Sequence, residues 1–204
     1  MDWWKKSFII VLGVGVIYCA GFVMGEKTAS RCLRFENIRT NHTVDYSRLI
    51  CPYSEPVKIL AARLKSPEEA FSFVRDEIRF EPYRPVESAT HVLREQAASC
   101  LGKAALLCSL YRAMGVPSSS VYVVTGQVAA GEEKVEHAWV NLAHDGKLYQ
   151  QDPSQLLGTF DFHDFPGQKY SQSFVHRELF CFNDDGFAVV SQLNRMSATV
   201  RRDD

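Results

Sequence analysis

Three residues in the middle of the chain have the types that nucleophilic catalysis on a carbonyl group needs: Cys100, His137 and Asp152. A cysteine thiolate can attack a carbonyl carbon, an imidazole can accept and return the proton, and a carboxylate can orient the imidazole. These residues are far apart along the chain. They form one site only if the fold places the elements that carry them side by side.

Cys100 begins a segment whose composition predicts a buried helix. Residues 99–117 read SCLGKAALLCSLYRAMGVP, with apolar side chains on nearly every side, and Ser99 is suited to cap the first turn. A helix N-terminus carries about half a positive charge and free N–H groups, which favour a thiolate and can bind an oxyanion. The alternative role of a cysteine is that of a small buried apolar residue. That role fits Cys108, which lies about 80° around and about 12 Å along the helix from Cys100.

His137 and Asp152 lie on two segments that predict a β-hairpin. Residues 135–142 (VEHAWVNL) alternate around His137, and residues 148–152 (LYQQD) end at Asp152. The dipeptide Asp145-Gly146 between them is typical of a two-residue turn. The sequence therefore predicts two neighbouring antiparallel strands that carry these two side chains.

The length of this turn sets the register of the hairpin. A two-residue turn pairs His144 with Lys147. Counting back along the strands, Trp139 lies opposite Asp152, and His137 shares the face of Trp139. Diagonal neighbours lie about 7–8 Å apart at the backbone, within reach of long side chains, although one additional residue in the turn would reverse the faces. A core histidine and an aspartate that caps a turn are the alternative roles.

The other segments predict helices followed by strands. We expect an α+β fold in which N-terminal helices pack on an antiparallel sheet. The aromatic run at 160–170 is expected to cover a sheet edge, and occlusion of the site is its alternative role. The expected elements are a short helix at 57–64, a helix that starts at the capping residue Ser66 and stops before Tyr83–Pro85, a short helix at 89–94, a loop at 96–99, strands at 121–128, 135–142 and 148–152 with a polar turn at 129–134, and a last strand pair around 183–186.

Residues 66–153 resemble the core of the transglutaminase-like superfamily, whose fold is related to that of papain-type cysteine proteases. The resemblance rests on SPEEAF, ATHVLREQAASCLGKAALLCSLYRAMGVP, EHAWVNL and YQQDPS. It implies that Cys100 is the nucleophile, that His137 is the general base and acid, and that Asp152 orients His137. Gln96, four residues before the cysteine, is either an oxyanion helper or a polar loop residue.

Two positions depart from the pattern of many relatives, which have a glycine before the cysteine and an acidic residue two positions after it. Ser99 and Gly102 stand there instead. This departure leaves the triad intact and the substrate preference open.

The reaction implied by the resemblance is attack on an amide carbonyl, release of an amine and formation of a thioester. Transfer to water would make the protein a cysteine peptidase or amidase, and transfer to a lysine amine would make it a transglutaminase. A non-catalytic binding or assembly subunit of a membrane-associated complex is the alternative to both.

The N-terminal residues predict a membrane anchor. Residues 7–25 (SFIIVLGVGVIYCAGFVMG) carry no charge and follow Lys5 and Lys6, and about 20 apolar residues span a bilayer. The positive-inside rule places the N-terminus in the cytoplasm and the rest of this single-pass protein in the periplasm or outside the cell. A cleaved signal peptide is the alternative. We expect the anchor at 1–25, a lead-in at 26–55 and one transglutaminase-like domain at 56–204 with its core at 66–153.

Cysteine spacing and charge limit the remaining function classes. Cys32 and Cys51 flank the lead-in, and they either form a disulfide in an oxidising compartment or stay free thiols. The net charge of −1 does not predict a nucleic-acid partner. Because the Cys and His spacings match no zinc site, we expect no metal site and no cofactor. No Asp-rich calcium loop is present, and the sequence leaves calcium dependence open. The expected partners are a protein or peptide substrate, the membrane and a membrane protein.

Overall fold

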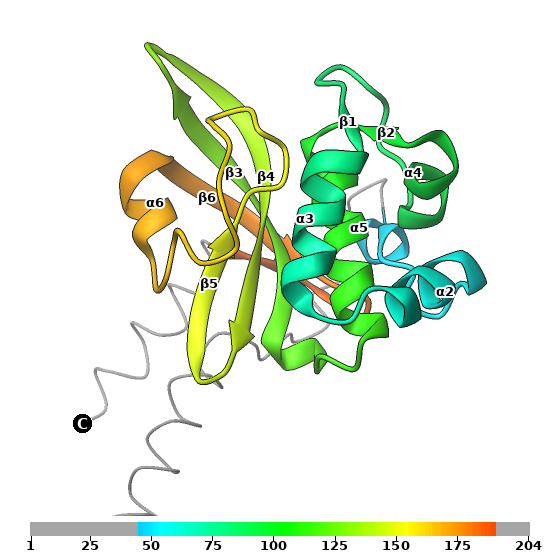
Figure 1. Cartoon of the computed structure of the whole chain (residues 1–204). Helices are drawn as coiled ribbons and strands as arrows, with labels where there is room; N and C mark the ends of the chain where they lie inside the picture. Colours follow the sequence, from blue (N-terminus) through cyan, green and yellow to red (C-terminus); the bar gives the residue numbers. More distant parts are fainter. Residues whose placement is uncertain (1–44, 191–204) are drawn as a thin grey trace, which may run out of the picture. The chain divides into compact units, whose positions relative to one another are not determined.

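A five-stranded antiparallel sheet with the strand order β5-β4-β3-β6-β7 forms the centre of the computed structural model, which describes residues 45–190. Helices α2 to α5 lie on one side of this sheet and α6 lies on the other (Figure 1). The helices are the 3-10 helix η2 (Tyr46–Leu49), α2 (Glu55–Arg63), α3 (Pro67–Glu77), α4 (Ala89–Glu95), α5 (Cys100–Ala113), the 3-10 helix η3 (Ser118–Ser120) and α6 (Lys169–Phe174). The strands are β1 (Arg79–Phe80), β2 (Ala97–Ala98), β3 (Val121–Ala130), β4 (Glu133–His144), β5 (Lys147–Gln151), β6 (Val175–Phe182) and β7 (Phe187–Val189). The predicted α+β arrangement is confirmed.

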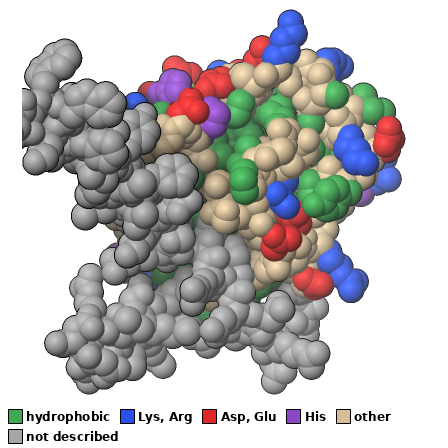
Figure 2. All heavy atoms as spheres, turned by 90° about the horizontal axis from the view of Figure 1, so that it is seen from below, with side chains coloured by type: hydrophobic (Ala, Val, Ile, Leu, Met, Phe, Trp, Pro, Cys, Tyr) green, Lys and Arg blue, Asp and Glu red, His purple; other side chains and the backbone are tan. Residues whose placement is uncertain are grey.

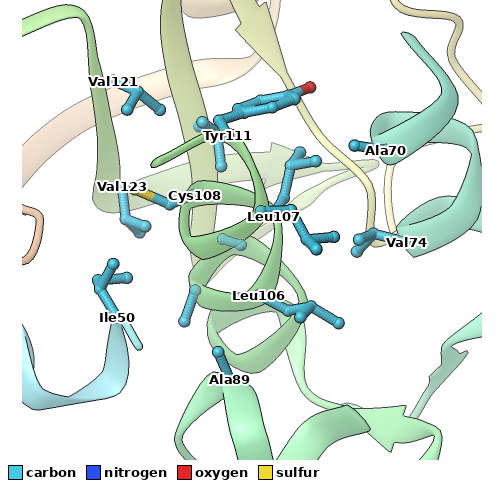
Figure 3. Close-up of a cluster of buried hydrophobic side chains, with 14 of the residues drawn as sticks. Ile50, Ala70, Val74, Ala89, Leu106, Leu107, Cys108, Tyr111, Val121 and Val123 are labelled. Carbon is cyan, nitrogen blue, oxygen red and sulfur yellow. The ribbon is translucent and has the colours of Figure 1, made fainter. Parts of the chain in front are cut away.

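Helix α5 is the centre of the hydrophobic core. Its side chains Leu106, Leu107, Cys108 and Tyr111 are fully buried, and they lie among residues of α3, α4 and β3 (Figure 3). Each large apolar side chain buried in this way stabilises the fold by about 1.5–3 kcal/mol relative to its exposed state. The helix is therefore fixed from all sides, as its composition predicts, and its first residue is held in place by the core behind it.

Helix α3 begins as predicted at Ser66, whose hydroxyl accepts a hydrogen bond from the Glu69 backbone N–H at 3.2 Å. The glutamate does not reach back to Ser66, as a full capping box would require. Its carboxylate instead accepts from the Lys65 backbone N–H at 3.0 Å. The buried face consists of Ala70, Phe71 and Val74.

The prediction that this helix continues towards Tyr83 is wrong, because α3 ends at Glu77. Strand β1 follows and pairs in parallel with β2, so the segment 96–99 is also not a plain loop. Two-residue strands carry no periodicity that could be detected in the sequence. This pairing joins the end of α3 to the residues immediately before Cys100.

The hairpin between β4 and β5 has the predicted two-residue turn. His144 pairs with Lys147, and Asp145 and Gly146 have φ values of 49° and 71°, as a type I′ turn requires. The predicted polar turn between β3 and β4 is too long, because these strands extend to Ala130 and Glu133 and leave only two residues between them.

The chain after β5 covers the edge of the sheet, as predicted. The Gln150 backbone N–H donates to the Phe165 carbonyl at 3.0 Å, and the Gly167 N–H donates to the Leu148 carbonyl at 2.8 Å. The expected last strand pair is β6 and β7, of which β6 pairs with β3. Residues that follow the β4–β5 hairpin in sequence thus form the edge of the sheet opposite β5.

Several expectations fall outside the described residues. They are the anchor at 1–25, most of the lead-in and Cys32. Within residues 45–190, no helix is long and apolar enough to cross a membrane. Cys51 is a free thiol with its Sγ 3.4 Å from the Arg48 carbonyl oxygen, and its pairing with Cys32 stays a prediction.

Candidate active site

Cys100 is the first residue of α5 and is partly exposed. Ser99 caps the helix, with its Oγ 3.5 Å from the Gly102 backbone nitrogen. The Glu81 N–H donates to the Ala98 carbonyl at 2.9 Å. The residues that precede the cysteine in the chain are therefore held by the β1–β2 pair. The thiol therefore lies at the positive end of a buried helix while remaining accessible to a reagent or substrate.

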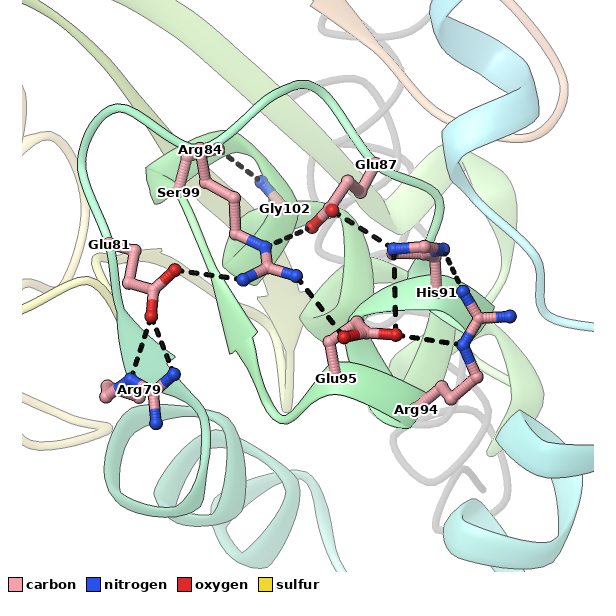
Figure 4. Close-up of polar contacts among 9 residues, drawn as sticks. All are labelled: Arg79, Glu81, Arg84, Glu87, His91, Arg94, Glu95, Ser99 and Gly102. Carbon is pink, nitrogen blue, oxygen red and sulfur yellow. Dashed lines mark hydrogen bonds and ion pairs between the residues drawn. The ribbon is translucent and has the colours of Figure 1, made fainter.

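A group of ion pairs fixes the segment between β1 and α4, next to the cap (Figure 4). The Arg84 guanidinium contacts Glu81 at 2.9 Å, Glu87 at 2.8 Å and Glu95 at 3.7 Å. Surface ion pairs contribute little singly, and this guanidinium joins three carboxylates while being only 19% exposed. Because Glu81 also binds β2 through its backbone, this network supports the residues that lead into Cys100.

His137 and Asp152 meet as the hairpin register predicts. Val140 of β4 pairs with Gln151 of β5, and the next residue, Asp152, receives a hydrogen bond from His137 Nε2 to Oδ2 at 2.8 Å. Both side chains are completely buried. Ala138 and Val140 point into the core with α5, so alternation along β4 leaves His137 on the other face of the strand.

Asp152 accepts hydrogen bonds at both carboxylate oxygens. Oδ1 accepts from the Ser154 backbone N–H at 2.9 Å and from Ser154 Oγ at 2.7 Å. Oδ2 accepts from His137 and from the Tyr170 hydroxyl, the latter at 2.9 Å. Burial alone would raise the pKa of Asp152, and the hydrogen bonds from His137 and Ser154 lower it below its usual value. The carboxylate is therefore ionised and fixed in orientation.

The second ring nitrogen of His137 is the one available to Cys100. Nδ1 is buried and has no hydrogen-bond partner among the described residues. Burial lowers the pKa of His137, but the hydrogen bond to Asp152 and the proximity of Cys100 raise it by more, to about 9. Because Nε2 is bound to the carboxylate, Nδ1 is the ring nitrogen that can accept the proton of the thiol. Such contacts are commonly loose in the absence of substrate.

Part of the chain that carries this site matches a known protein family. Residues 53–153 match the family model described as the transglutaminase-like superfamily. The chain carries a transglutaminase-like core. A search among curated proteins finds no significant match.

Solved structures with a similar fold include two bacterial proteins. A candidate cysteine protease from Cytophaga hutchinsonii is 17% identical, with a TM-score of 0.47, and the match covers 67% of this chain and 48% of that one. LapG from Legionella pneumophila is 14% identical, with a TM-score of 0.48, and the match covers 71% of this chain and 83% of that one. This chain thus matches about half the length of the Cytophaga protein.

Two residues that hold the Asp152 carboxylate were not predicted from sequence. Ser154 lies two residues after Asp152, and an aspartate often accepts a hydrogen bond from the backbone two residues on, so the motif DPS contained a signal for the contact of the Ser154 N–H. Tyr170 lies in the aromatic run, where nothing in the spacing distinguishes it from its neighbours. Only the return of the chain along the edge of β5 brings it to Asp152.

Lys103 is a third residue that sequence analysis did not identify. It lies one turn after the cysteine and is only 1% exposed. Its ammonium group donates to the carbonyl oxygens of Ile78 at 2.7 Å and Arg75 at 3.0 Å, at the end of α3. Burial lowers its pKa to about 8, although Asp152 and Asp76 act in the opposite direction. Lys103 thus fixes α3 to the helix that carries the thiol and places a positive charge near the Asp152 carboxylate.

The remaining candidates lie outside this cluster. Gln96 is exposed at the end of α4 with a φ of 51°, and its role as an oxyanion helper stays a prediction. Cys108 is buried, and burial raises its pKa beyond the ordinary range of thiols, as expected for a core residue. Within residues 45–190, no group of three His, Cys, Asp or Glu side chains is placed to hold a metal ion.

A groove of about 810 Å³ lies at the opposite end of α5 from the cysteine. It lies between α2, the C-terminal end of α5 and the β4–β5 turn, and Leu64, Met114 and His144 are among its lining residues. Seen from below, hydrophobic side chains gather in the middle of the described face with charged side chains around them (Figure 2). Because α5 is 14 residues long, this groove is about 20 Å from Cys100 and is not part of the triad.

Proposed function

We propose that this protein is a cysteine peptidase or amidase that uses Cys100, His137 and Asp152 as its catalytic triad. The observation that carries the proposal is the buried His137–Asp152 hydrogen bond of 2.8 Å. Cys100, the partly exposed first residue of α5, lies close enough to His137 to raise its pKa. The histidine nitrogen that is not bound to Asp152 has no other partner among the described residues. Each group therefore has the partner that its role requires.

In the acylation step, the Cys100 thiolate attacks the carbonyl carbon of an amide. The electron pair of the C=O bond moves to oxygen, and the N–H groups in the first turn of α5 can stabilise this oxyanion. The protonated imidazole of His137 gives its proton to the amide nitrogen as the C–N bond breaks. An amine leaves, and the acyl group remains on Cys100 as a thioester.

In the deacylation step, His137 takes a proton from water, and the resulting hydroxide attacks the thioester. The C–S bond breaks, a carboxylic acid is released and the thiolate is restored beside the imidazolium. Asp152 keeps its charge throughout, because its acceptor positions are filled by His137, Ser154 and Tyr170. Its role is to orient the imidazole and to stabilise its charged form.

The place of action in this proposal follows from the N-terminal segment. The charge-free residues 7–25 after Lys5 and Lys6 would hold the domain at the outer side of the cytoplasmic membrane, in the periplasm or outside the cell. A protein or peptide is the expected substrate, and a membrane protein is a further expected partner. Labelling of an engineered external cysteine by a membrane-impermeant reagent in intact cells tests this placement.

The test of the activity is alkylation of the full-length protein, purified in detergent, with iodoacetamide across the pH range. Mass mapping follows Cys100, and a free small-molecule thiol such as N-acetylcysteine, alkylated under the same conditions, serves as the reference. We expect fast alkylation of Cys100 near neutral pH and a clear decrease in His137→Ala. The matched control is His144→Ala on the same strand, whose side chain is 29% exposed, and it should leave the rate unchanged.

The outcome separates the three function classes. If Cys100 reacts no faster than the free reference thiol, the triad does not activate the thiol, and a binding or assembly subunit replaces the hydrolase proposal. If Cys100 is activated, peptide libraries are incubated with and without a fluorescent primary amine. New peptide termini support the hydrolase, whereas incorporation of the amine without hydrolysis assigns the protein to the amine-transferring class.

A further inference from the structure

We propose that Tyr170 is a positioning residue of the active site: its hydroxyl donates to Asp152 Oδ2, the same oxygen that accepts from His137, and so fixes the carboxylate that orients the imidazole. The inference deepens the proposed function and rests on it. It also means that the site is completed by α6, which lies beyond the residues 53–153 that match the family model.

Tyr170 differs from Ser154 in the oxygen of Asp152 to which it donates. An ionised carboxylate has about four acceptor positions, and four donor contacts are present. Ser154 makes two of them, both to Oδ1. Tyr170 at 2.9 Å and His137 at 2.8 Å share Oδ2. Tyr170 is therefore the second donor to the oxygen that His137 binds, while Ser154 donates to Oδ1 and its Oγ lies 3.4 Å from His137 Nε2.

The tyrosine ring cannot easily move away from this position. Tyr170 is fully buried, and its ring lies 5.5 Å from Trp139 of β4 and 5.2 Å from Phe174 of α6. The helix itself is attached to β5, because the Ser171 N–H donates to Gln150 Oε1 at 3.0 Å and Gln150 Nε2 donates to Ser171 Oγ at 2.7 Å. These contacts hold the hydroxyl in place independently of its bond to Asp152.

The surrounding charges keep this hydroxyl a donor. Burial and the neighbouring Asp152 raise the pKa of Tyr170 far above its ordinary value, so the phenol stays protonated. Cys100 and Lys103 of α5 are ionisable groups that act on the His137–Asp152 pair. On β6, the Glu178 carboxylate accepts from the Ser171 hydroxyl, next to Tyr170, at 3.2 Å, and burial raises the pKa of Glu178. Because the phenol draws charge from Oδ2, its loss should make the carboxylate a stronger partner for the imidazolium. The carboxylate would at the same time be less firmly oriented.

The experiment measures the titration of His137 by NMR in the full-length protein with Cys100→Ala, so that the thiol does not contribute. We expect Tyr170→Phe to raise the midpoint by roughly half to one pH unit. The matched control is Tyr111→Phe, which removes another fully buried hydroxyl, one that donates to Gln151 at 2.7 Å. The control should leave the midpoint of His137 unchanged.

A second comparison shows whether the effect passes through the carboxylate. In a background of Asp152→Asn, the shift caused by Tyr170→Phe should disappear. An equal shift in both backgrounds, or no shift with Asp152 present, overturns the positioning role. Neither result depends on activity, so the hydrolase proposal is judged separately by the alkylation of Cys100.

If Tyr170→Phe does not fold, 3-fluorotyrosine incorporation replaces it. A more acidic phenol should lower the midpoint, and an unchanged midpoint overturns the inference.

With Cys100 present, the same variant provides a functional readout. Tyr170→Phe should move the pH profile of Cys100 alkylation, whereas Tyr111→Phe should leave that profile unchanged. A loss of stability in both variants with a changed pH profile only in Tyr170→Phe supports positioning. Equal pH profiles in both variants would reduce Tyr170 to a packing residue.

Discussion

His137 Nε2 lies 2.8 Å from Asp152 Oδ2, and neither side chain is exposed to solvent. Breaking a buried pair by removing one partner is costly, because the other group stays behind without compensation. The pair therefore links the chemistry of the site to the stability of the fold, and the two effects must be separated by matched variants.

Asp152→Asn should slow the alkylation of Cys100 at pH 7 by about tenfold or more, since a change of one pKa unit in the His137 interaction corresponds to a factor of ten. It should also lower the free energy of unfolding by about 1–3 kcal/mol, because buried donors lose their acceptor. The measurements are alkylation kinetics by mass spectrometry and urea unfolding.

The matched control for this variant is Asp184→Asn. Asp184 is also largely buried and contacts Arg112 at 2.7 Å, at the other end of α5. It should destabilise the protein without slowing alkylation. Similar kinetics in the two variants would show that Asp152 has only a structural role.

The free energy of unfolding should depend on pH through His137. Its pKa is raised from 6.5 to about 9, because the Asp152 hydrogen bond and Cys100 outweigh the effect of burial. A group whose pKa is higher in the folded state contributes stability below its unfolded pKa and loses it as the pH rises to the folded value. The stability difference between the wild type and His137→Gln should therefore shrink between pH 6.5 and 9. A constant difference in urea unfolding across this window would contradict the raised pKa.

The lowered pKa of Lys103 predicts that the free energy of unfolding depends on pH with the opposite sign. Burial lowers its pKa from 10.5 to about 8, so the unfolded chain binds the proton more tightly than the folded protein does. Stability should rise with pH between 8 and 10.5 in the wild type relative to Lys103→Met. Thermal unfolding of both proteins at several pH values in this window tests the sign, and a falling difference would exclude it.

Ser99→Ala removes the cap of helix α5, which begins at Cys100. We expect a loss of about 1 kcal/mol, the usual effect of an N-cap hydroxyl, together with slower alkylation of Cys100. Ser66→Ala is the matched control, because Ser66 caps α3 through the Glu69 N–H in the same way. Both variants should melt at lower temperature, and only Ser99→Ala should change the thiol. A normal alkylation rate in Ser99→Ala would show that this cap does not support the site.

The hairpin that joins His137 to Asp152 could be predicted because its register depends on local chemistry. Asp145 and Gly146 adopt positive φ values, so the turn has two residues, and alternation then fixes the face of each side chain. The start of α5 was predictable for the same reason, since a capping serine and an apolar segment define a helix locally. These two local features determine most of the candidate site.

The other parts of the site depend on contacts between distant segments. The β1–β2 pair joins residues that flank α4, and each strand is too short to show a pattern. Tyr170 reaches Asp152 only after the chain has passed along β5. Lys103 resembles a surface residue of a helix until the end of α3 is placed over it. Sequence periodicity identifies elements, but it does not identify which distant carbonyl or carboxylate a side chain will meet.

The strand order β5-β4-β3-β6-β7 places the last strands beside the first long one. Until β6 has been synthesised, β3 has an unpaired side, and its ten residues, most of them buried in the final fold, form an exposed edge that can pair with other chains. Pairing of segments so distant in sequence is slow. We therefore expect that a chain cut after Pro153 would keep all three triad residues and aggregate during folding, whereas the full chain would acquire reactivity at Cys100 only late in refolding.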